Sequence, residues 1–423
     1  MRQMKDSGIE WVGQIPNNWE VHPLYYFFAE RKHKNRIGQE TNLLSLSYGK
    51  VVRKDINTSE GLLPENYNGY NIVEKDDIVL RLTDLQNDKK SLRTGLIKEH
   101  GILTSAYVTL KPIRQFDSRF FHYVLHTYDT LKVFYNMGNG VRQGLNYDEL
   151  SKCLLIEAPF FEQKVIADHL DKKCAGIDEL IANIQEEIDT LEQYKRSVIT
   201  EAVTKGLNPD IEMKEDGLTW LGRYPSHWHH YRGKYLFEQR NEKGNRIELQ
   251  LLSPTQNYGV IPQSRYEELS GMSAVKLNGS VDLALLKTIH KGDFCISLRS
   301  FQGGFEYSLY EGVVSPAYQV FYPTKAIYDG YYKYLFKEKS FIAVINSYTL
   351  SLRDGKNIAF KDFGNTEIPY PPLEEQEQIA KFLDEKCAEI DSCIGEKQSQ
   401  IDTLESYKKS IIFEYVTGKK QVI

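Results

Sequence analysis

The chain has few cysteines, and none of them is placed to build a site. There are five among 423 residues, an odd number, and no two form a Cys-x-x-Cys pair. That pattern excludes both a disulfide framework and a zinc knuckle. We therefore predict reduced, mostly buried thiols, with no metal site and no cofactor. The five are Cys153, Cys174, Cys295, Cys387 and Cys393.

Long apolar runs are absent as well. No stretch approaches the roughly 20 apolar residues that a bilayer-spanning helix needs. The first residues also lack the apolar centre of a secretory signal. The expected location is the cytoplasm, with no membrane partner.

Two catalytic motifs are missing. There is no Gly-x-x-x-x-Gly-Lys-Ser/Thr phosphate loop, which excludes ATP-driven translocation by this chain. There is no Asn-Pro-Pro-aromatic motif with a glycine-rich cofactor loop either, which argues against methyl transfer to a DNA amino group and leaves an enzyme with a cryptic active site as a rival interpretation. We predict no catalytic residue and no enzyme activity, so the function to look for is binding.

Charge is distributed unevenly along the chain. The formal net charge is -5, which would disfavour a polyanionic partner if it were spread evenly. Residues 1–158 hold 21 basic and 19 acidic side chains, however, and residues 216–370 hold 18 and 15. Both regions are net positive, and the acidic excess lies in the segments between and after them. A nucleic-acid partner therefore stays open.

What the sequence does contain is an internal repeat with an offset near 210 residues. Such a repeat decides the fold and is sought first. Trp11 falls on Trp220 within a shared Trp-x-Gly-x-x-Pro-x-x-Trp motif. Three matches in the same order indicate duplication of one unit. The matching segments are 7–19 with 216–228, 101–107 with 312–318, and 188–191 with 401–404.

The first part of each unit mixes strand and helix signals. Short β-rich runs occur at Asp77–Leu82 and Asp293–Leu298, among Gly and Asn turn residues. Aromatic-rich helices are predicted at Asp117–Tyr135 and Tyr328–Ser347. These parts are predicted to be α+β lobes.

The second part of each unit carries a heptad seam, with apolar residues spaced alternately four and three apart. Proline followed by carboxylates opens each stretch, as is typical of a helix start. Lys195, Lys397 and Lys408 interrupt the seam, so the helices either pair imperfectly or turn these positions toward a partner. The seam residues are Leu170, Ile177, Ile181, Ile184, Ile188, Leu191, Leu383, Ile390, Ile394, Ile401 and Leu404.

One helix from Glu162 to about Thr204 would be roughly 65 Å long. Two copies can bury their stripes against each other, which favours an antiparallel coiled coil with one lobe near each end. The alternative is that each helix packs only on its own lobe. The fold class is thus α+β: two mixed lobes in pseudo-two-fold repeat, separated by two long helices. The predicted divisions are a lobe over 1–158, a helix over 159–206, a linker over 207–215, a lobe over 216–370 and a helix over 371–423.

Three motifs recur in order: the Trp-x-Gly-x-x-Pro-x-x-Trp opening, a Pro-Pro-Leu-Glu-Glu-Gln helix start at 371–376, and Tyr-Lys-x-Ser near each helix end. The first copy departs at its helix start, which reads Pro-Phe-Phe-Glu-Gln over 159–163. Over nearly its whole length the chain resembles the specificity subunits of type I restriction-modification systems. The resemblance implies two target-recognition domains that each read half of a split DNA sequence.

The resemblance also implies that the helices form a spacer. The spacer would dock two modification subunits, which methylate DNA, and through them the restriction subunits, which are ATP-dependent endonucleases and translocases. Two rigid readers on one duplex share a face when their half-sites lie about one helical turn, roughly 34 to 36 Å, apart. A spacer helix is long enough to set that distance.

Candidate contacts to double-stranded DNA are clusters of basic and amide side chains in both lobes. Cations on phosphates supply affinity, and arginine or glutamine at base edges supplies sequence choice. The alternative for any one of them is an ordinary solvated side chain. The predicted residues are Arg31, Lys32, Lys34, Arg36, Tyr48, Lys50, Arg53, Lys54, Arg81, Lys89, Lys90, Arg93, Arg142, Gln143, Arg240, Lys243, Arg246, Gln256, Tyr258, Arg265, Arg299, Gln302 and Arg353.

Two further interpretations remain to be tested. His122 and His126 lie four apart on a predicted helix, where Lys333 and Lys337 stand in the repeat, so we interpret all four as a solvated basic face. A scaffold protein with two protein-binding lobes is the alternative function. The sequence leaves open the target bases, the gap between them, the family of modification subunit, and whether the helices pair within one chain or between two.

Overall fold

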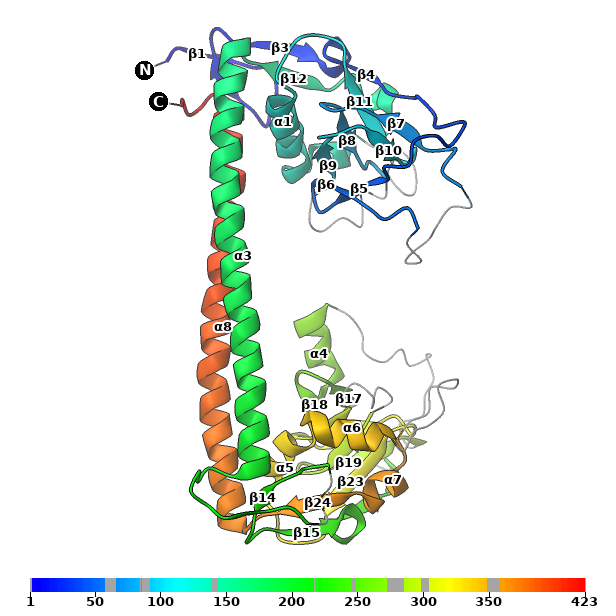
Figure 1. Ribbon diagram of the computed structural model, residues 1–423, viewed down its shortest axis with the longest axis vertical. Coiled ribbons are helices and arrows are strands. Elements are labelled where there is room, and N and C mark those ends of the chain that lie inside the picture. Colours follow the sequence, from blue (N-terminus) through cyan, green and yellow to red (C-terminus); the bar gives the residue numbers. More distant parts are fainter. Residues whose placement is uncertain are drawn as a thin grey trace. The chain divides into compact units, whose positions relative to one another are not determined.

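The two copies of the repeat carry the same four-stranded antiparallel sheet. Its strand order is β4-β11-β8-β9 in the first copy (Figure 1) and β16-β23-β20-β21 in the second. The duplication predicted from sequence is therefore also a duplication of topology. The strands are β4 (Phe28–Glu30), β8 (Ile78–Leu80), β9 (Thr94–Leu96), β11 (Val108–Pro112), β16 (Phe237–Arg240), β20 (Phe294–Ile296), β21 (Phe305–Tyr307) and β23 (Gln319–Pro323).

The computed structural model divides into two units. The first contains Met1–Gln185 with Lys397–Ile423, and the second contains Glu186–Glu396. Each unit thus holds one lobe together with a part of each long helix. The structure describes residues 2–57, 66–83, 85, 92–137, 144–216, 218, 220–244, 249–271, 285–297, 304–347 and 358–422.

Four two-stranded pairs surround the sheet in each lobe, and they too recur in the same order. In the first lobe they are β1 (Met4–Asp6) with β2 (Gln14–Pro16), β3 (Glu20–Pro23) with β12 (Leu154–Glu157), β5 (Leu44–Ser47) with β6 (Lys50–Arg53), and β7 (Asn71–Val73) with β10 (Gly101–Leu103). In the second they are β13 (Met213–Lys214) with β14 (Tyr224–Pro225), β15 (His229–Arg232) with β24 (Glu367–Tyr370), β17 (Leu252–Thr255) with β18 (Gly259–Pro262), and β19 (Lys287–Ile289) with β22 (Gly312–Val314).

The helices fall into short ones within the lobes and two long ones. No helix in the described ranges is long and apolar enough to cross a membrane. The long helices are α3 (Phe160–Lys205) and α8 (Leu373–Val416). The short ones are η1 (Leu24–Tyr26), α1 (Ser118–Thr130), η3 (Val133–Asn136), α2 (Tyr147–Leu150), η4 (Gly233–Tyr235), α4 (Gln263–Ser270), α5 (Asp329–Leu335), α6 (Lys339–Ser347) and α7 (Phe360–Asn365).

Both predicted lobe helices are broken in two. The first is α1 followed by η3, because Lys132 takes a left-handed conformation with φ 61° after α1 ends. The second is α5 followed by α6, and the buried Glu338 between them accepts a hydrogen bond from the backbone N–H of Phe341, at 2.9 Å. Each pair contributes side chains to one aromatic core.

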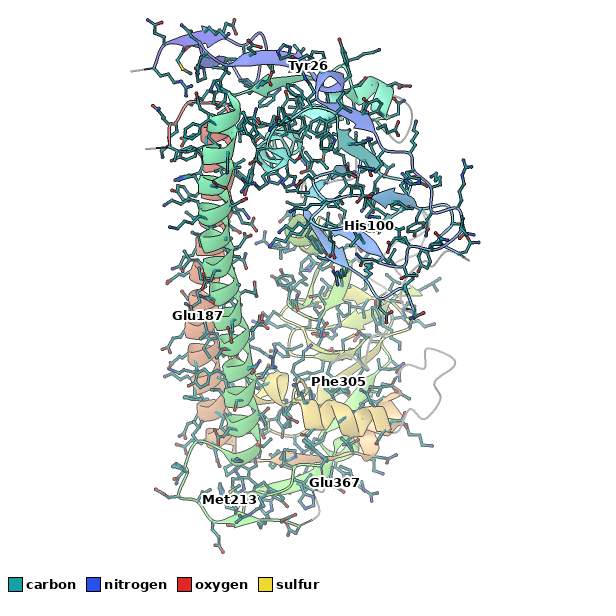
Figure 2. All side chains as sticks on the ribbon, turned by 45° about the horizontal axis from the view of Figure 1, so that its top comes forward. Tyr26, His100, Glu187, Met213, Phe305 and Glu367 are labelled. Atoms are coloured by element: carbon teal, nitrogen blue, oxygen red, sulfur yellow. The ribbon has the colours of Figure 1, made fainter. Side chains whose placement is uncertain are left out.

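Aromatic side chains fill the lobe cores. In the first lobe, Phe121 of α1 lies 4.5 Å from Phe27 between ring centroids, and both are buried. In the second, Phe305, labelled in Figure 2, packs 5.3 Å from Phe341 and 5.6 Å from Phe336. Four of the five cysteines are buried, Cys393 is exposed, and all are free thiols, as predicted.

In each unit the two long helices pack against each other as well as on the lobe. In the first unit, Ile166 and Leu170 from the start of α3 share one buried cluster with Ile411 and Val416 from the end of α8. In the second, Val203 from the end of α3 shares a cluster with Ile379 and other residues from the start of α8. In both units, therefore, the start of one long helix contacts the end of the other.

Burial along the seam is complete in some places and partial in others. Leu170, Ile177, Ile188, Leu383, Ile390 and Ile401 are buried. Ile181, Ile184, Leu191, Ile394 and Leu404 are half-buried.

Two of the lysines that interrupt the seam make ion pairs across it. Lys408 Nζ lies 2.5 Å from Asp178 Oδ1 in the first unit, and Lys195 Nζ lies 2.6 Å from Asp391 Oδ2 in the second. The two pairs occupy matching positions of the repeat. Partial burial alone would raise the pKa of Asp178, but hydrogen bonds and charge from Lys408 and Lys50 hold that pKa below its ordinary value. Charge thus replaces apolar packing at these positions of the seam.

Removing a buried seam leucine should cost far more stability than removing an exposed one. Leu170 and Leu383 have no exposed surface, so changing either to Ala should lower the unfolding free energy by about 2–5 kcal/mol. Leu180 on α3 is 52% exposed, so Leu180→Ala should stay within about 0.5 kcal/mol. Chemical denaturation followed by circular dichroism measures both. Equal losses at the three positions would contradict the packing described.

Candidate nucleic-acid interface

An exposed Tyr-Gly turn stands at the tip of one hairpin in each lobe. In the first lobe, Tyr48 and Gly49 join β5 to β6 with φ values of 47° and 76°. Positive φ at both residues is the type I′ geometry that matches strand twist. In the second lobe, β17 and β18 are joined through Tyr258, which precedes Gly259 at φ 70°. Tyr48 is 75% exposed and Tyr258 is 49% exposed, so both rings face solvent.

A small apolar core holds the first hairpin on the sheet. Leu44, Val73 and Val79 are buried in it, and Leu46 packs against them. Gly95 of β9 makes this approach possible, because a Cβ there would lie 2.6 Å from Leu46 Cδ1. The tip therefore stands on a rigid support, as a binding surface requires.

Cations line the same hairpin. Lys50 follows the turn, is 71% exposed and lies 3.3 Å from Asp178 of α3. Arg53 is 70% exposed, and its Nε donates to both carboxylate oxygens of Glu99, at 2.7 and 2.8 Å. Lys54 is exposed. The structure brings these three predicted residues together with Tyr48 on one hairpin.

Two of the predicted arginines are held inside their lobes. Arg31 donates to the buried carboxylate of Asp77 at 2.9 Å, and its side chain is 13% exposed. Arg240 makes the same contact with Asp293, at 2.7 Å, in the second lobe. Each aspartate also accepts a backbone N–H from the turn before the next strand, at 2.9 Å. Burial raises the pKa of Asp77, although Arg31 acts in the opposite direction. Both arginines therefore tie a strand to a turn.

Arg93 is also buried. Its Nη1 donates to the backbone carbonyls of Arg81 and Thr83, at 3.2 and 2.5 Å, and its own backbone N–H donates to Asp129 at 2.7 Å. The predicted Arg93 thus supports the loop, whereas Arg81 is exposed on it.

The remaining described residues lie at the surface with different surroundings. Lys34 donates to the carbonyl of Gly69 at 2.9 Å, Lys32 pairs with Glu30 at 2.7 Å and Arg265 pairs with Glu268 at 2.8 Å. Arg36, Lys243 and Gln256 are exposed. The predicted contacts that lie outside the described residues are Lys89, Lys90, Arg142, Gln143, Arg246, Arg299, Gln302 and Arg353.

A cleft of about 800 Å³ lies in the first unit between this hairpin, α1, α3 and α8. Tyr48 and Lys50 form part of its wall. Sequence reasoning missed its other cations because they come from segments far apart in the chain and form no local cluster. They are Lys98, Arg119, Lys408 and Lys409.

The interpretation of His122 and His126 as a solvated basic face is wrong. Both line the cleft and are half-buried on α1. Burial lowers the pKa of His122 to about 4 and that of His126 to about 3, so both are neutral at neutral pH. Their counterparts in the second lobe form ion pairs, Lys333 with Asp384 at 3.1 Å and Lys337 with Glu306 at 2.6 Å.

Arg31 and Arg36 separate a folding role from a binding role within one predicted cluster. Arg31→Ala leaves the Asp77 carboxylate buried without its partner, so it should cost about 3 kcal/mol of unfolding free energy. Arg36→Ala changes an exposed side chain and should change stability by less than about 0.5 kcal/mol. Urea denaturation at neutral pH compares them. An Arg31→Ala protein as stable as wild type would show that the ion pair does not support the lobe.

Comparison with known proteins agrees with this architecture. A family model described as the type I restriction modification DNA specificity domain matches residues 225–402. A putative type I restriction enzyme MjaX specificity subunit from Methanocaldococcus jannaschii is 24% identical, over 97% of this chain and 96% of its own length. The type I restriction enzyme MjaVIII specificity subunit of the same organism is 41% identical over 15% of this chain and 16% of its own.

A solved structure has a similar fold. One chain from a structural study of complex assembly and conformational transition in the type I R-M system superposes with a TM-score of 0.67. The two chains are 14% identical, and the match covers 96% of this chain and 99% of the other. The mixed helix and strand content predicted from sequence is confirmed.

Proposed function

We propose that this chain is a specificity subunit of a type I restriction-modification system and that it reads a DNA sequence in two separated parts, one for each lobe. The observation that carries the proposal is the repetition of one reading element. Both lobes have the same strand order, and both present an exposed Tyr-Gly hairpin tip. Similarity to these specificity subunits favours DNA recognition by a non-catalytic subunit over a protein-binding scaffold.

The long helices are proposed to form the spacer between the readers. α3 and α8 would make an antiparallel coiled coil that separates two recognition domains over 1–158 and 216–370, with a linker at 207–215. The contacts between start and end of the helices in each unit support this arrangement. A stiff spacer fixes the gap between half-sites, because each reader can then reach only one register of the duplex.

The proposed DNA contacts are those predicted residues whose side chains are exposed. Cations would bind phosphates and fix position, and the tips with their amide and aromatic groups would contact bases. Arg31, Arg93 and Arg240 are left out because each is held by its own lobe. Lys34 is left out because it is half-buried and donates to the Gly69 carbonyl. The described set is Lys32, Arg36, Tyr48, Lys50, Arg53, Lys54, Arg81, Lys243, Gln256, Tyr258 and Arg265. Arg299, Gln302 and the other predicted residues outside the described ranges stay predictions.

Two modification subunits are the proposed protein partners, with restriction subunits joining through them in the cytoplasm. Exposed apolar side chains recur at matching helix positions, which suits two copies of one partner. Phe160 is 50% exposed and its counterpart Leu373 is 48% exposed. Tyr194 and its counterpart Tyr407 are both 50% exposed. Tyrosine is among the residues enriched at interface centres.

Methylome sequencing of cells that carry the intact system tests the proposal. The expected result is a split motif with a fixed gap. Replacing Gln256 and Tyr258 together by Ala should relax or change one half of that motif and leave the other half intact. The weakened half should lose about 1–3 kcal/mol of discrimination for each lost base contact.

The matched control carries the double change Lys5→Ala and Glu10→Ala, at exposed positions of the first lobe outside the predicted clusters. It should leave both halves unchanged. An uninterrupted motif in the wild type, or equal damage to both halves in the tip variant, would rule out one reader per lobe.

A further inference from the structure

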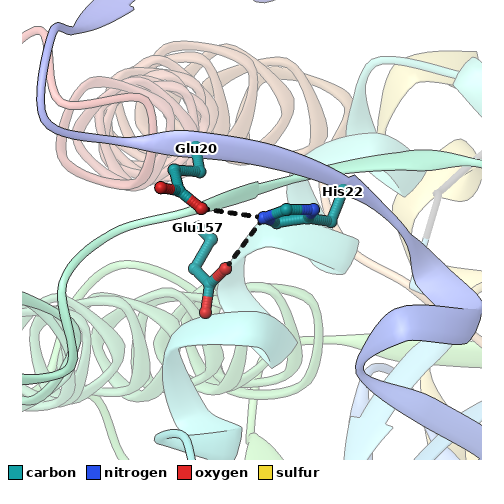
Figure 3. Close-up of side chains that lie close together, drawn as sticks. All are labelled: Glu20, His22 and Glu157. Atoms are coloured by element: carbon teal, nitrogen blue, oxygen red, sulfur yellow. Dashed lines mark hydrogen bonds and ion pairs between the residues drawn. The ribbon is translucent and has the colours of Figure 1, made fainter.

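Three potential metal ligands converge on one face of the strand pair β3–β12. Glu20 and His22 are two residues apart on β3, so their side chains point to the same face. Glu157 of β12 stands directly opposite Glu20. Among the described residues, theirs are the ligand atoms found in a group of three within 4.8 Å of one another. Figure 3 shows both carboxylates reaching the same imidazole nitrogen.

The unusual feature is that both carboxylates approach Nε2. His22 Nε2 lies 2.9 Å from Glu20 Oε2 and 3.4 Å from Glu157 Oε2. One ring nitrogen carries at most one hydrogen. A hydrogen bond to one glutamate therefore leaves the other with no hydrogen directed at it.

Two other histidines show the ordinary arrangement. His100 faces Glu40 through Nε2 at 2.8 Å and Glu74 through Nδ1 at 3.0 Å. His290 likewise directs Nε2 to Glu242 and Nδ1 to Glu311. Each nitrogen of these rings serves one carboxylate, which is the arrangement that hydrogen bonding favours. His22 departs from it, although it too lies between two glutamates.

A zinc ion satisfies the three groups together. Zinc binds imidazole nitrogen at about 2.0–2.1 Å and carboxylate oxygen at about 2.0–2.2 Å, with tetrahedral angles. Two ligand atoms on such an ion lie about 3.4 Å apart. The Nε2–oxygen separations of 2.9 and 3.4 Å are close to that value. Two carboxylates also balance the charge of a divalent cation, and the imidazole favours zinc over calcium or magnesium.

The imidazole is held in place before any ion arrives. Tyr26 stacks on the His22 ring at 4.2 Å between centroids with an interplanar angle of 17°. Arg114 lies over the other ring of this stack, 3.8 Å from the centroid of Tyr26. A side chain fixed by packing loses little freedom on binding, so the imidazole ligand is preorganised.

In the second repeat, aromatic residues occupy two of the three matching positions. Tyr231 and Tyr370 occupy the positions of His22 and Glu157 on β15 and β24. Their rings meet edge to face at 5.4 Å, and Lys325 lies over Tyr231. An aromatic contact thus joins the two strands in the second lobe, where the first lobe has three polar ligands with charge to neutralise.

We propose that Glu20, His22 and Glu157 bind a zinc ion that fastens β3 to β12. Glu157 lies three residues before Phe160, where α3 begins. The ion would therefore stiffen the base of the first lobe where it joins α3. This proposal does not depend on DNA recognition.

Zinc titration of the purified full-length chain against a chromophoric chelator tests the site. The expected result is one tight zinc ion per chain and a rise in melting temperature, because a ligand that binds the folded state stabilises it. Glu20→Gln and His22→Gln should each weaken zinc binding at least about tenfold, since loss of even an outer-shell partner costs that much. Glu20 is 68% exposed, so its variant keeps the fold.

His100→Gln is the matched control, because His100 also lies between two glutamates but uses both nitrogens. It should bind zinc as the wild type does. The proposal is overturned if the wild type shows no stoichiometric zinc ion, if Glu20→Gln and His22→Gln bind it with unchanged affinity, or if His100→Gln loses it equally.

Discussion

The structure depends on the burial of two apolar helix stripes, each of which is too long to be covered by its own lobe. In each unit the end of one helix packs on the opening tryptophan of the other repeat. Gly418, just after α8, lies against Trp19, and Gly206, just after α3, lies against Trp228. Both glycines have positive φ, near 70°, which ends the helix at the point of contact. In each unit, therefore, a helix from one repeat contacts the lobe of the other repeat.

That reciprocity extends to charge. Lys195 with Asp391 and Lys408 with Asp178 are the same ion pair made twice, once in each unit. An interface between two related copies repeats its contacts in this way. Isolated pairs at partly exposed positions contribute little stability, about 0–1 kcal/mol each. Their value lies in register, because a helix shifted by one turn would leave both lysines opposite the wrong side chains.

The sequence predicted the large features because each rests on a periodic signal. The duplication and the mixed helix and strand content of the two lobes both appear in the structure. Single side chains were harder to predict. A basic residue in a cluster looks the same whether it is solvated, as Arg36 is, or paired with a buried aspartate, as Arg31 is. The partner Asp77 lies 46 residues away along the chain, so no local pattern links the two. The prediction that His122 and His126 are solvated was wrong for the same reason, since the groups that bury them come from distant segments.

Repeats can also keep a contact while exchanging its residues. Glu74 after β7 pairs with His100 before β10 in the first lobe, whereas His290 after β19 pairs with Glu311 before β22 in the second. Comparison of the two copies position by position would miss this.

The central claim is that one lobe reads one half-site. Its most direct test is the methylome of a complex whose specificity chain carries the first lobe twice, with residues 1–158 in place of 216–370. We predict a split motif whose second half is the inverted complement of the first, with the gap unchanged; retention of the original two-part motif by the assembled complex would contradict the claim.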